Sequence, residues 1–553
     1  MDANQATAGL RGAVSDWTAL LGSEWVHVSS ERLESLERGT FLTHGHVHAH
    51  LCPGSVDEVV ECVRIAVRHG QRVNVFSRGK NYGYGACAPC NGITTAIELS
   101  RLNAITEFDD ELGYVRIQAG VTFAQLIDFL SEQSTLRYLP ATGGPADGSI
   151  LANTVERGHG LGFGGNRYEH SCRYEVVTAR GERFETGFGR FEGSRIANLM
   201  RSGVGPSLDG LFTQSSLGIV TAATLWLPRK PRFHTSFLVT TRSHDRVGVL
   251  FDCIGEATRQ GLIRDGSAFA MNSYKLASIL HRRIDLVSTD AALGWDELSK
   301  HGKRWGHVQW LLNASVEGDT KALLKAKLKA FTSIFRSVLG SGEHLIKISS
   351  LRSRAVRAIS QFLPRPLAGL MGQLVDVFYE HTPLLGHPIE RPLRTVYWAL
   401  PHRDSNECKD LHGDSVGLLW VSVPVPLRKN DINEVCSIID NGLLAFGFEP
   451  STQVTLVSER LGRVITALMY DRLQPGQDTK AIECQQSVYD ELRRRGHYTY
   501  RLQSHLMEEY ANYGTAHQLV SARIKKTLDP EDILDPSRYP ATSEPRGTRG
   551  SEA

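Results

Sequence analysis

The nine residues Ser77–Gly85, SRGKNYGYG, constrain the fold most strongly, because they place a glycine-rich loop directly after a predicted strand. The strand is expected over 71–76, QRVNVF, where apolar and polar residues alternate. The three glycines of the loop permit positive φ and bring backbone N–H groups close to a ligand. Successive N–H groups of this kind form an anion-binding nest. The segment is therefore typical of a nucleotide site, and its Tyr84 offers a phenol group to a substrate.

A second glycine-rich stretch runs from Thr142 to Gly165, TGGPADGSILANTVERGHGLGFGG. So much glycine is inconsistent with a continuous helix or strand, so we expect irregular backbone close to a ligand. Apolar periodicity predicts helices and strands around it. We expect helices at 56–70 and 122–133, and strands at 93–100, 114–120, 173–187 (with a turn at 180–181) and within 210–231.

The length of 553 residues is too great for one core and predicts two lobes. Prolines and basic residues at 228–232 mark the boundary. In the second lobe a strand, a turn and an amphipathic helix follow His307, and the same order repeats from Val416. These patterns predict an α+β lobe with an antiparallel sheet and helices on one face. The tail 541–553 is too polar to pack.

The composition excludes several classes of partner. A formal net charge of +2 gives no reason to expect nucleic acid or an anionic membrane. There is no run of 18 apolar residues and no signal-peptide pattern at the start, so we expect a cytoplasmic protein. Nine scattered cysteines do not form a disulfide framework. Cys87 and Cys90 are either small loop residues, which we favour, or a redox or metal pair.

Four motifs occur in order: GKNYGYG at 79–85, GSILANTVERG at 148–158, SSLGIVTAATLWL at 215–227 and TYRLQSHLMEEYANY at 499–513. This ordered set resembles the vanillyl-alcohol oxidase and p-cresol methylhydroxylase (PCMH) family of FAD-dependent oxidoreductases, over nearly the whole chain. The resemblance implies an α+β fold with a PCMH-type, two-subdomain FAD-binding domain at 1–232. It also implies a cap domain at 233–497 over the isoalloxazine ring, and a segment at 498–540 that returns to the FAD domain.

The resemblance also assigns residues to the cofactor. The loop corresponds to the pyrophosphate cradle, the second glycine-rich stretch to another cofactor strip, and the third motif to the adenosine end. The residues concerned are Ser77, Arg78, Gly79, Lys80, Asn81, Tyr82, Gly83, Gly85, Thr142, Gly143, Gly144, Gly148, Ser149, Asn153, Gly218, Ile219, Val220 and Arg538.

In the phenol-oxidising branch of that family, two tyrosines and an arginine bind a para-alkylphenol as its phenolate. The matching residues are Tyr84, Tyr500 and Arg501. A phenolate pushes electrons through the ring and makes the benzylic hydride a better leaving group, while an arginine and two phenols stabilise its charge. Hydride transfer to flavin then leaves a para-quinone methide that water attacks. The alternative for Arg501 is a surface ion pair with Glu508 or Glu509.

Two departures from the family are visible. Many relatives tether the flavin through a histidine or tyrosine on a cap strand, and the matching position here is Leu418. We therefore predict non-covalent FAD. Trp420 is interpreted as lining the substrate cavity or, equally, as a residue of the cap core. The position of the family's catalytic aspartate is Gly144, so the nearby Asp147 is either a displaced base or a turn residue.

The segment THGHVHAH places His44, His46, His48 and His50 on one face of an extended strand. We predict no metal site, because a metal would need further ligands from elsewhere. For these histidines we favour a position on an exposed strand edge over a position close to the edge of the flavin.

Three functions remain open from the sequence. The first is FAD-dependent oxidation of a para-substituted phenol at its benzylic carbon, by an oxidase or a dehydrogenase. The second keeps the fold but oxidises a C–OH or C–H bond of a hydroxy acid, a sugar or a natural-product intermediate. The third is a scaffold without turnover. The expected partners are an aromatic small molecule and either molecular oxygen or an electron-acceptor protein, and a homodimer is one possible assembly.

Overall fold

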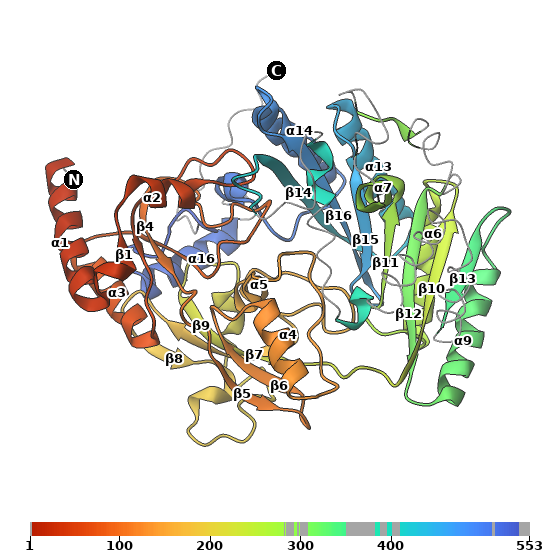
Figure 1. The fold of residues 1–553 in the computed structure, drawn as a ribbon, viewed down its shortest axis with the longest axis horizontal. Helices are drawn as coiled ribbons and strands as arrows, with labels where there is room; N and C mark the ends of the chain where they lie inside the picture. Colours follow the sequence, from red (N-terminus) through yellow and green to blue (C-terminus); the bar gives the residue numbers. More distant parts are fainter. Residues whose placement is uncertain are drawn as a thin grey trace.

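The computed structural model describes residues 3–280, 283, 292–295, 298, 308–349, 382–386, 395–400, 410–510 and 515–540. Within these residues, three sheets and the helices packed on them make up an α+β fold, which confirms the predicted class. In Figure 1 two small sheets lie in the lobe on the left, and a large sheet forms the lobe on the right. The predicted tail at 541–553 lies outside the described residues.

The first sheet of the left-hand lobe carries the glycine loop. Its strand order is β1-β2-β4-β3, in which β2, β4 and β3 run parallel and β1 is antiparallel to β2. The strands are β1 (Val26–His27), β2 (His46–Leu51), β3 (Val73–Phe76) and β4 (Ile93–Glu98), and the helices are α1 (Ala3–Leu21), α2 (Ser30–Glu37) and α3 (Val56–Arg68). Ser55 caps the N-terminus of α3, because its hydroxyl accepts from the N–H of Glu58.

The second sheet of this lobe is antiparallel, in the order β5-β6-β9-β7-β8. The elements are β5 (Ile105–Asp109), β6 (Tyr114–Gln118), α4 (Phe123–Glu132), α5 (Ile150–Val155), β7 (Ser171–Val177), β8 (Arg183–Glu185) and β9 (Ile219–Trp226). The second glycine-rich stretch is irregular apart from α5. Ser149 caps this short helix by accepting from the N–H of Ala152, 2.9 Å away.

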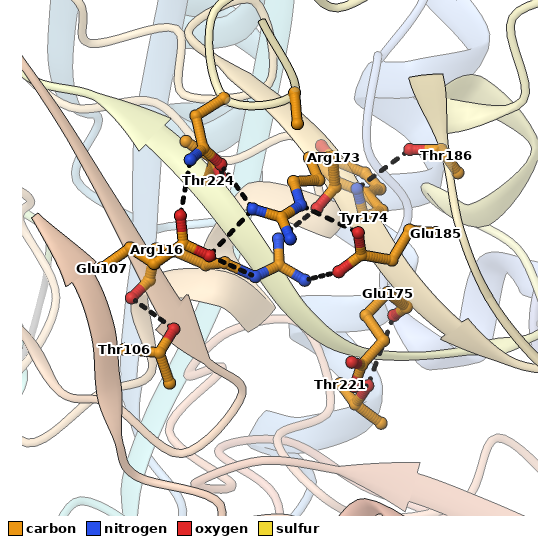
Figure 2. A network of polar contacts seen from close by, with 12 residues as sticks. Thr106, Glu107, Arg116, Arg173, Tyr174, Glu175, Glu185, Thr186, Thr221 and Thr224 are labelled. Carbon is orange, nitrogen blue, oxygen red and sulfur yellow. Dashed lines mark hydrogen bonds and ion pairs between the residues drawn. The ribbon is translucent and has the colours of Figure 1, made fainter. Parts of the chain in front are cut away.

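A network of partly buried charges joins the strands of the second sheet (Figure 2). Arg173, on β7, donates to Glu107 and to Glu185, both at 2.8 Å. Arg116, on β6, which β9 separates from β7, also donates to Glu185. Because each carboxylate faces two guanidinium groups, the charges compensate one another. We assign this network to the stability of the sheet, since none of its four ion-paired residues lines either cavity described below.

The right-hand lobe is built on one antiparallel seven-stranded sheet, in the order β13-β10-β12-β11-β15-β16-β14. Its strands are β10 (Phe233–Thr241), β11 (Ala268–Asn272), β12 (Trp310–Gly318), β13 (His344–Ile348), β14 (Val416–Pro426), β15 (Ser451–Leu456) and β16 (Leu461–Asp471). The helices are α6 (Arg246–Arg259), α7 (Ser273–Leu280), α9 (Lys321–Arg336), α13 (Lys429–Ala445) and α14 (Gln477–Arg494). The two predicted strand–helix repeats are β12–α9 and β14–α13.

The two faces of the large sheet have different roles. On one face α6, α9, α13 and α14 bury a core with residues such as Phe251, Phe331 and Ile439. On the other face, strand residues such as Leu418 and Met271 belong to smaller clusters. This second face faces the left-hand lobe and lines a cavity. The predicted boundary after residue 232 lies between β9 and β10.

The C-terminal segment packs on the left-hand lobe. Figure 1 shows α16 (Thr515–Leu528, blue) among the red and orange elements of that lobe. The N–H of Val73 donates to Ile533, and the N–H of Asp535 donates back to Val73, so the segment extends the edge of β3. α15 (Met507–Tyr510) and the 3-10 helices lie in the connections. The 3-10 helices of the described residues are Ser23–Trp25, Gly187–Arg190, Asp209–Phe212, Pro383–Leu385, Val396–Ala399 and Ser504–Leu506. Among the described residues, no helix is both long and apolar enough to cross a membrane.

Candidate active site

A long trough runs through the left-hand lobe from the end of β3 to the start of β9. Its volume is about 1300 Å³, including the part open to solvent. The glycine loop, the cap of α5 and the residues before β9 form its walls, and the C-terminal segment contributes Arg501 and Arg538. Among the described residues its charged lining comprises Arg78, Lys80, Arg501, Arg538, Glu156 and Asp535, which leaves an excess of positive charge.

The loop presents a row of free donors to this trough. In the part of the chain that the structure describes, the N–H groups of residues 77–81 donate to no protein acceptor. Gly79 has a φ of +62°, which turns the loop at that point. The side chain of Arg78 donates to the carbonyl of Gly120 at 2.9 Å and so fastens the loop to the next segment. The loop therefore has the properties of an anion-binding nest.

Glu156 lies at the junction of the trough and the C-terminal segment. It accepts a hydrogen bond from Arg538, and the Nε atom of Arg501 is 3.7 Å from its carboxylate. Burial alone would raise the pKa of Glu156, but the charges of Arg538 and Arg501 outweigh burial and lower it. The carboxylate therefore stays ionised and holds both arginines in place.

A second cavity lies between the two lobes and meets the trough. Its volume is about 1500 Å³, including the part open to solvent. Seven residues line both spaces: Lys80, Asn81, Thr142, Gly144, Pro145, Asn153 and Arg501. The inner face of the large sheet supplies its apolar wall, with Phe269, Met271, Leu418, Trp420 and Ile465. A molecule in this cavity is thus next to one end of the trough.

Two tyrosines and two arginines converge in the second cavity. The guanidinium carbon of Arg501 is 4.1 Å from the centroid of the Tyr84 ring, and its Nη2 donates to Asn81 at 2.7 Å. Arg463, on β16, donates from Nη1 to the hydroxyl of Tyr500 at 2.9 Å. The alternative for Arg501, a surface ion pair with Glu508 or Glu509, is not seen: its side chain is only 7% exposed and approaches Glu156 instead.

The electrostatics of this group keep Tyr84 protonated. Burial raises the pKa of the Tyr84 phenol, Tyr500 adds to this, and the positive charge of Arg501 opposes it without reversing the shift. Tyr84 is therefore a hydrogen-bond donor at neutral pH. Arginine is protonated at neutral pH and is therefore also a donor. The group as a whole is suited to binding an oxyanion.

Comparison with known proteins identifies the family. Residues 47–187 match the family model described as FAD binding domain. The chain is 36% identical to the 1'-carboxy-chondrochloren decarboxylase of Chondromyces crocatus, over 96% of this chain and 98% of that protein. It is 24% identical to the flavoprotein subunit of the hydroxylating 4-cresol dehydrogenase of Pseudomonas putida, over 95% of this chain and 94% of the relative. The crystal structure of p-cresol methylhydroxylase with substrate bound superposes with a TM-score of 0.83 at 23% identity, covering 96% and 97% of the two chains. The chain belongs to the PCMH-type family of FAD-dependent oxidoreductases.

The trough of this PCMH-type chain fits FAD by its free N–H donors and its excess positive charge. It is lined by every residue that the sequence assigned to the cofactor except Tyr82, Gly83, Gly85 and Gly143. Tyr82 and Gly143 line the second cavity instead.

The structure does not support a cofactor role for Gly83 and Gly85. A Cβ atom on Gly83 would lie 2.4 Å from the Trp420 ring, and one on Gly85 would lie 2.7 Å from the hydroxyl of Ser504. These two glycines therefore allow the loop to pack against the cap strand β14 and the C-terminal segment.

Leu418 and Trp420 both line the second cavity, side by side on β14. The indole of Trp420 donates to the carbonyl of Tyr82 at 3.0 Å, so it connects the cap to the loop as well. A leucine cannot form a bond to flavin, so the prediction of a non-covalent cofactor stands as a prediction.

Asp147 does not reach either cavity. Its side chain is 62% exposed, and the nearest cation is the Nζ atom of Lys80, 3.3 Å away. This position fits the alternative of a turn residue and gives no support to Asp147 as a catalytic base. The geometry instead assigns Asp147 to the surface pair with Lys80.

The histidine row and the cysteine pair also lie outside both cavities. His44 and His46 are exposed, whereas His48 bonds Thr95 and His50 bonds Glu98. His50, His27 and Cys52 have ligand atoms within 4.8 Å of one another, but burial raises the pKa of Cys52 to about 12 and keeps it a neutral thiol. Cys87 and Cys90 are free, and burial raises the pKa of both to about 12.

Sequence reasoning did not single out Glu156, which lines the trough, or His159, Lys275 and Arg463, which line the second cavity. Burial holds the pKa of His159 well below its usual value, and its ring packs edge-on against Tyr500. The sequence held a signal for Arg463, because it lies two residues before Ile465 on the same strand and so points to the same face of the sheet. Lys275 likewise interrupts an apolar helical run, SYKLASIL.

Proposed function

We propose that this protein oxidises a para-substituted phenol at the benzylic carbon, with the phenol bound as its phenolate by Tyr84, Tyr500 and Arg501. The observation that carries the proposal is the convergence of these side chains in the cavity that meets the trough. Arg463, bonded to Tyr500, adds a second guanidinium to the group. The apolar wall formed by Phe269, Met271 and Ile465 suits an aromatic ring.

The residues of the clamp have distinct tasks. Arg501 lowers the free energy of the phenolate through its fixed charge, and the protonated Tyr84 donates a hydrogen bond to the same oxygen. Arg463 orients the hydroxyl of Tyr500. FAD, bound by the residues of the trough, supplies the two-electron acceptor for the benzylic hydride. Electron donation from the phenolate oxygen through the ring stabilises the benzylic carbon that has lost the hydride, and the product is a quinone methide.

The fate of the quinone methide separates two candidates. Water addition gives a benzylic alcohol, the reaction expected from the likeness to a hydroxylating 4-cresol dehydrogenase. The similarity to a decarboxylase favours a second candidate, in which the substrate carries a carboxylate on the carbon next to the benzylic one. The C–CO₂⁻ bond then breaks, its electron pair forms a carbon–carbon double bond, and the phenolate is restored as CO₂ leaves.

Anaerobic mixing with 4-ethylphenol and with 3-(4-hydroxyphenyl)propanoate tests the proposal. We expect loss of the oxidised flavin absorbance with at least one of them, and a much slower loss in the Tyr500→Phe variant. Mass spectrometry of the products separates hydroxylation from release of CO₂. If neither phenol reduces the flavin while a hydroxy acid or a sugar does, the phenol proposal is wrong.

We also propose that FAD is bound without a covalent bond. After acid precipitation the yellow colour should remain in the supernatant. Colour in the protein pellet would contradict this. The electron acceptor after flavin reduction, oxygen or another protein, is tested by reoxidation in air.

A further inference from the structure

Lys275 is a buried cation of the second cavity that the phenolate clamp does not use. It lies on α7, in the cap, and only 8% of its surface is exposed. Its ammonium donates to the hydroxyl of Thr395 at 3.5 Å, and no carboxylate of the described residues lies within ion-pairing distance. A buried ammonium without a counter-ion is strongly unfavourable, so such a group is retained where it serves a ligand.

The charges around the cavity point to an anionic ligand. Four cations line it, Lys80, Lys275, Arg463 and Arg501, and its described lining contains no aspartate or glutamate. Lys80 is paired with Asp147 and Arg501 with Glu156, both outside this lining. Lys275 and Arg463 are left without a carboxylate partner in the described structure, and the Nε atom of Arg463 has no acceptor.

The two unpaired cations come from different parts of the cap. Arg463 is connected to the phenolate clamp by its hydrogen bond to Tyr500. Lys275 lies on α7, and Ile279, one helical turn further along, lines the cavity beside it. Burial lowers the pKa of Lys275 to about 8, so an anion beside it would find a protonated partner near neutral pH. One negative charge, the phenolate, is accounted for by the clamp.

We infer that Lys275 binds a carboxylate on the para side chain of the substrate, so that the substrate class is a 4-hydroxyphenyl compound bearing a carboxylic acid. This inference rests on the proposed function for the phenol end of the ligand. It adds a second point of attachment, which fixes the side chain and with it the benzylic carbon. A single ammonium also discriminates against uncharged alkylphenols of the same length.

Binding of non-oxidisable analogues tests the inference. In 4-hydroxyphenoxyacetate an ether oxygen replaces the benzylic carbon, so no hydride can leave and affinity is measured by calorimetry on the FAD-loaded protein. We expect the acid to bind at least about 10-fold more tightly than its primary amide, the size of one charge-assisted hydrogen bond. In Lys275→Met this ratio should fall to about 1. Lys325→Met, on the exposed face of α9, should keep the wild-type ratio.

Each outcome bears on one end of the ligand. An unchanged ratio in Lys275→Met, or failure of the acid to bind the wild-type protein, overturns the carboxylate site. The phenol end is tested separately with 4-methoxyphenol, whose binding should weaken in Arg501→Ala. If 4-methoxyphenol binds Arg501→Ala as well as the wild type, while the acid-to-amide affinity ratio still depends on Lys275, the proposed function is wrong and the carboxylate site at Lys275 stands.

The melting temperature of the ligand-free protein gives an independent test. Because Met removes an unpaired buried charge, the ligand-free Lys275→Met protein should melt at the same temperature as the wild type or above it. A lower melting temperature with an unchanged ratio would assign Lys275 a structural partner and contradict the inference.

Discussion

The guanidinium of Arg501 lies over the ring of Tyr84, with its central carbon 4.1 Å from the ring centroid. The two residues are more than four hundred positions apart, and the contact exists because the C-terminal segment packs on the lobe that carries the glycine loop. The same guanidinium donates to Asn81 and approaches Glu156. Arg501 thus touches both the trough and the second cavity, where a substrate and FAD would meet.

Removal of the Arg501 guanidinium tests the clamp. In Arg501→Ala the rate constant for flavin reduction by 4-ethylphenol should fall about 100-fold, the effect of losing one oxyanion donor. The flavin content should stay close to that of the wild type, because the N–H groups of 77–81 remain. Stopped-flow absorbance measures the rate. The control is Arg494→Ala, which removes an exposed arginine of α14; an equal loss in both variants would contradict the assignment.

The hydrogen bond between Arg463 and Tyr500 should make the effects of substituting the two residues energetically coupled. Tyr500→Phe removes the acceptor of the Arg463 Nη1 donor, and Arg463→Met removes the donor. In a double-mutant cycle on the rate of flavin reduction, the two substitutions should be non-additive by more than about 0.5 kcal/mol. Additive effects would show that the two residues act independently.

The packing of the loop against the cap is tested by a matched pair of glycines. Gly83 has a φ of +75° and Gly92 a φ of +69°, so alanine at either site meets a similar backbone penalty of about 1–2 kcal/mol. Only at Gly83 would the new Cβ clash with Trp420, whereas nothing lies within 4 Å at Gly92. Gly83→Ala should therefore melt at a clearly lower temperature than Gly92→Ala. Equal melting temperatures would mean that the contact with Trp420 is unimportant.

Buried histidines should make the protein sensitive to acid. Burial lowers the pKa of His412 and of His505 to about 4. Each stays neutral in the folded state but takes up a proton near pH 6.5 when unfolded, so the free energy of unfolding falls as the pH drops from 6.5 to 4. In His505→Gln the slope of denaturation free energy against pH should be shallower, by up to about 1.4 kcal/mol per pH unit. An unchanged slope would show that His505 does not titrate in this way.

Much of the fold was predictable because it follows local patterns. Alternating residues before the glycine loop predicted β3, and helical apolar spacing predicted α3, α4 and the two strand–helix repeats. The placement of Tyr84 and Arg501 together came from the family resemblance, since no local pattern relates residues so far apart.

The rest of the site depends on tertiary contacts. Arg463 and Lys275 each leave only a weak signal in the sequence, and their importance appears only when the inner face of the large sheet closes a cavity over them. Gly83 read as a cofactor residue because positive φ looks the same whether a ligand or an indole lies nearby. Asp147 stayed open between a base and a turn residue, because its spacing from Gly148 cannot show that its side chain points to solvent.

The most direct test of the central claim compares 3-(4-hydroxyphenyl)propanoate with its phenol methyl ether, 3-(4-methoxyphenyl)propanoate, which has the same benzylic hydrogens but cannot form a phenolate. Both are mixed anaerobically with the FAD-loaded protein, and the absorbance of the oxidised flavin is followed. We predict rapid reduction by the phenol and none by the ether. Equal reduction by both compounds, or reduction by neither, would contradict a phenolate clamp formed by Tyr84, Tyr500 and Arg501.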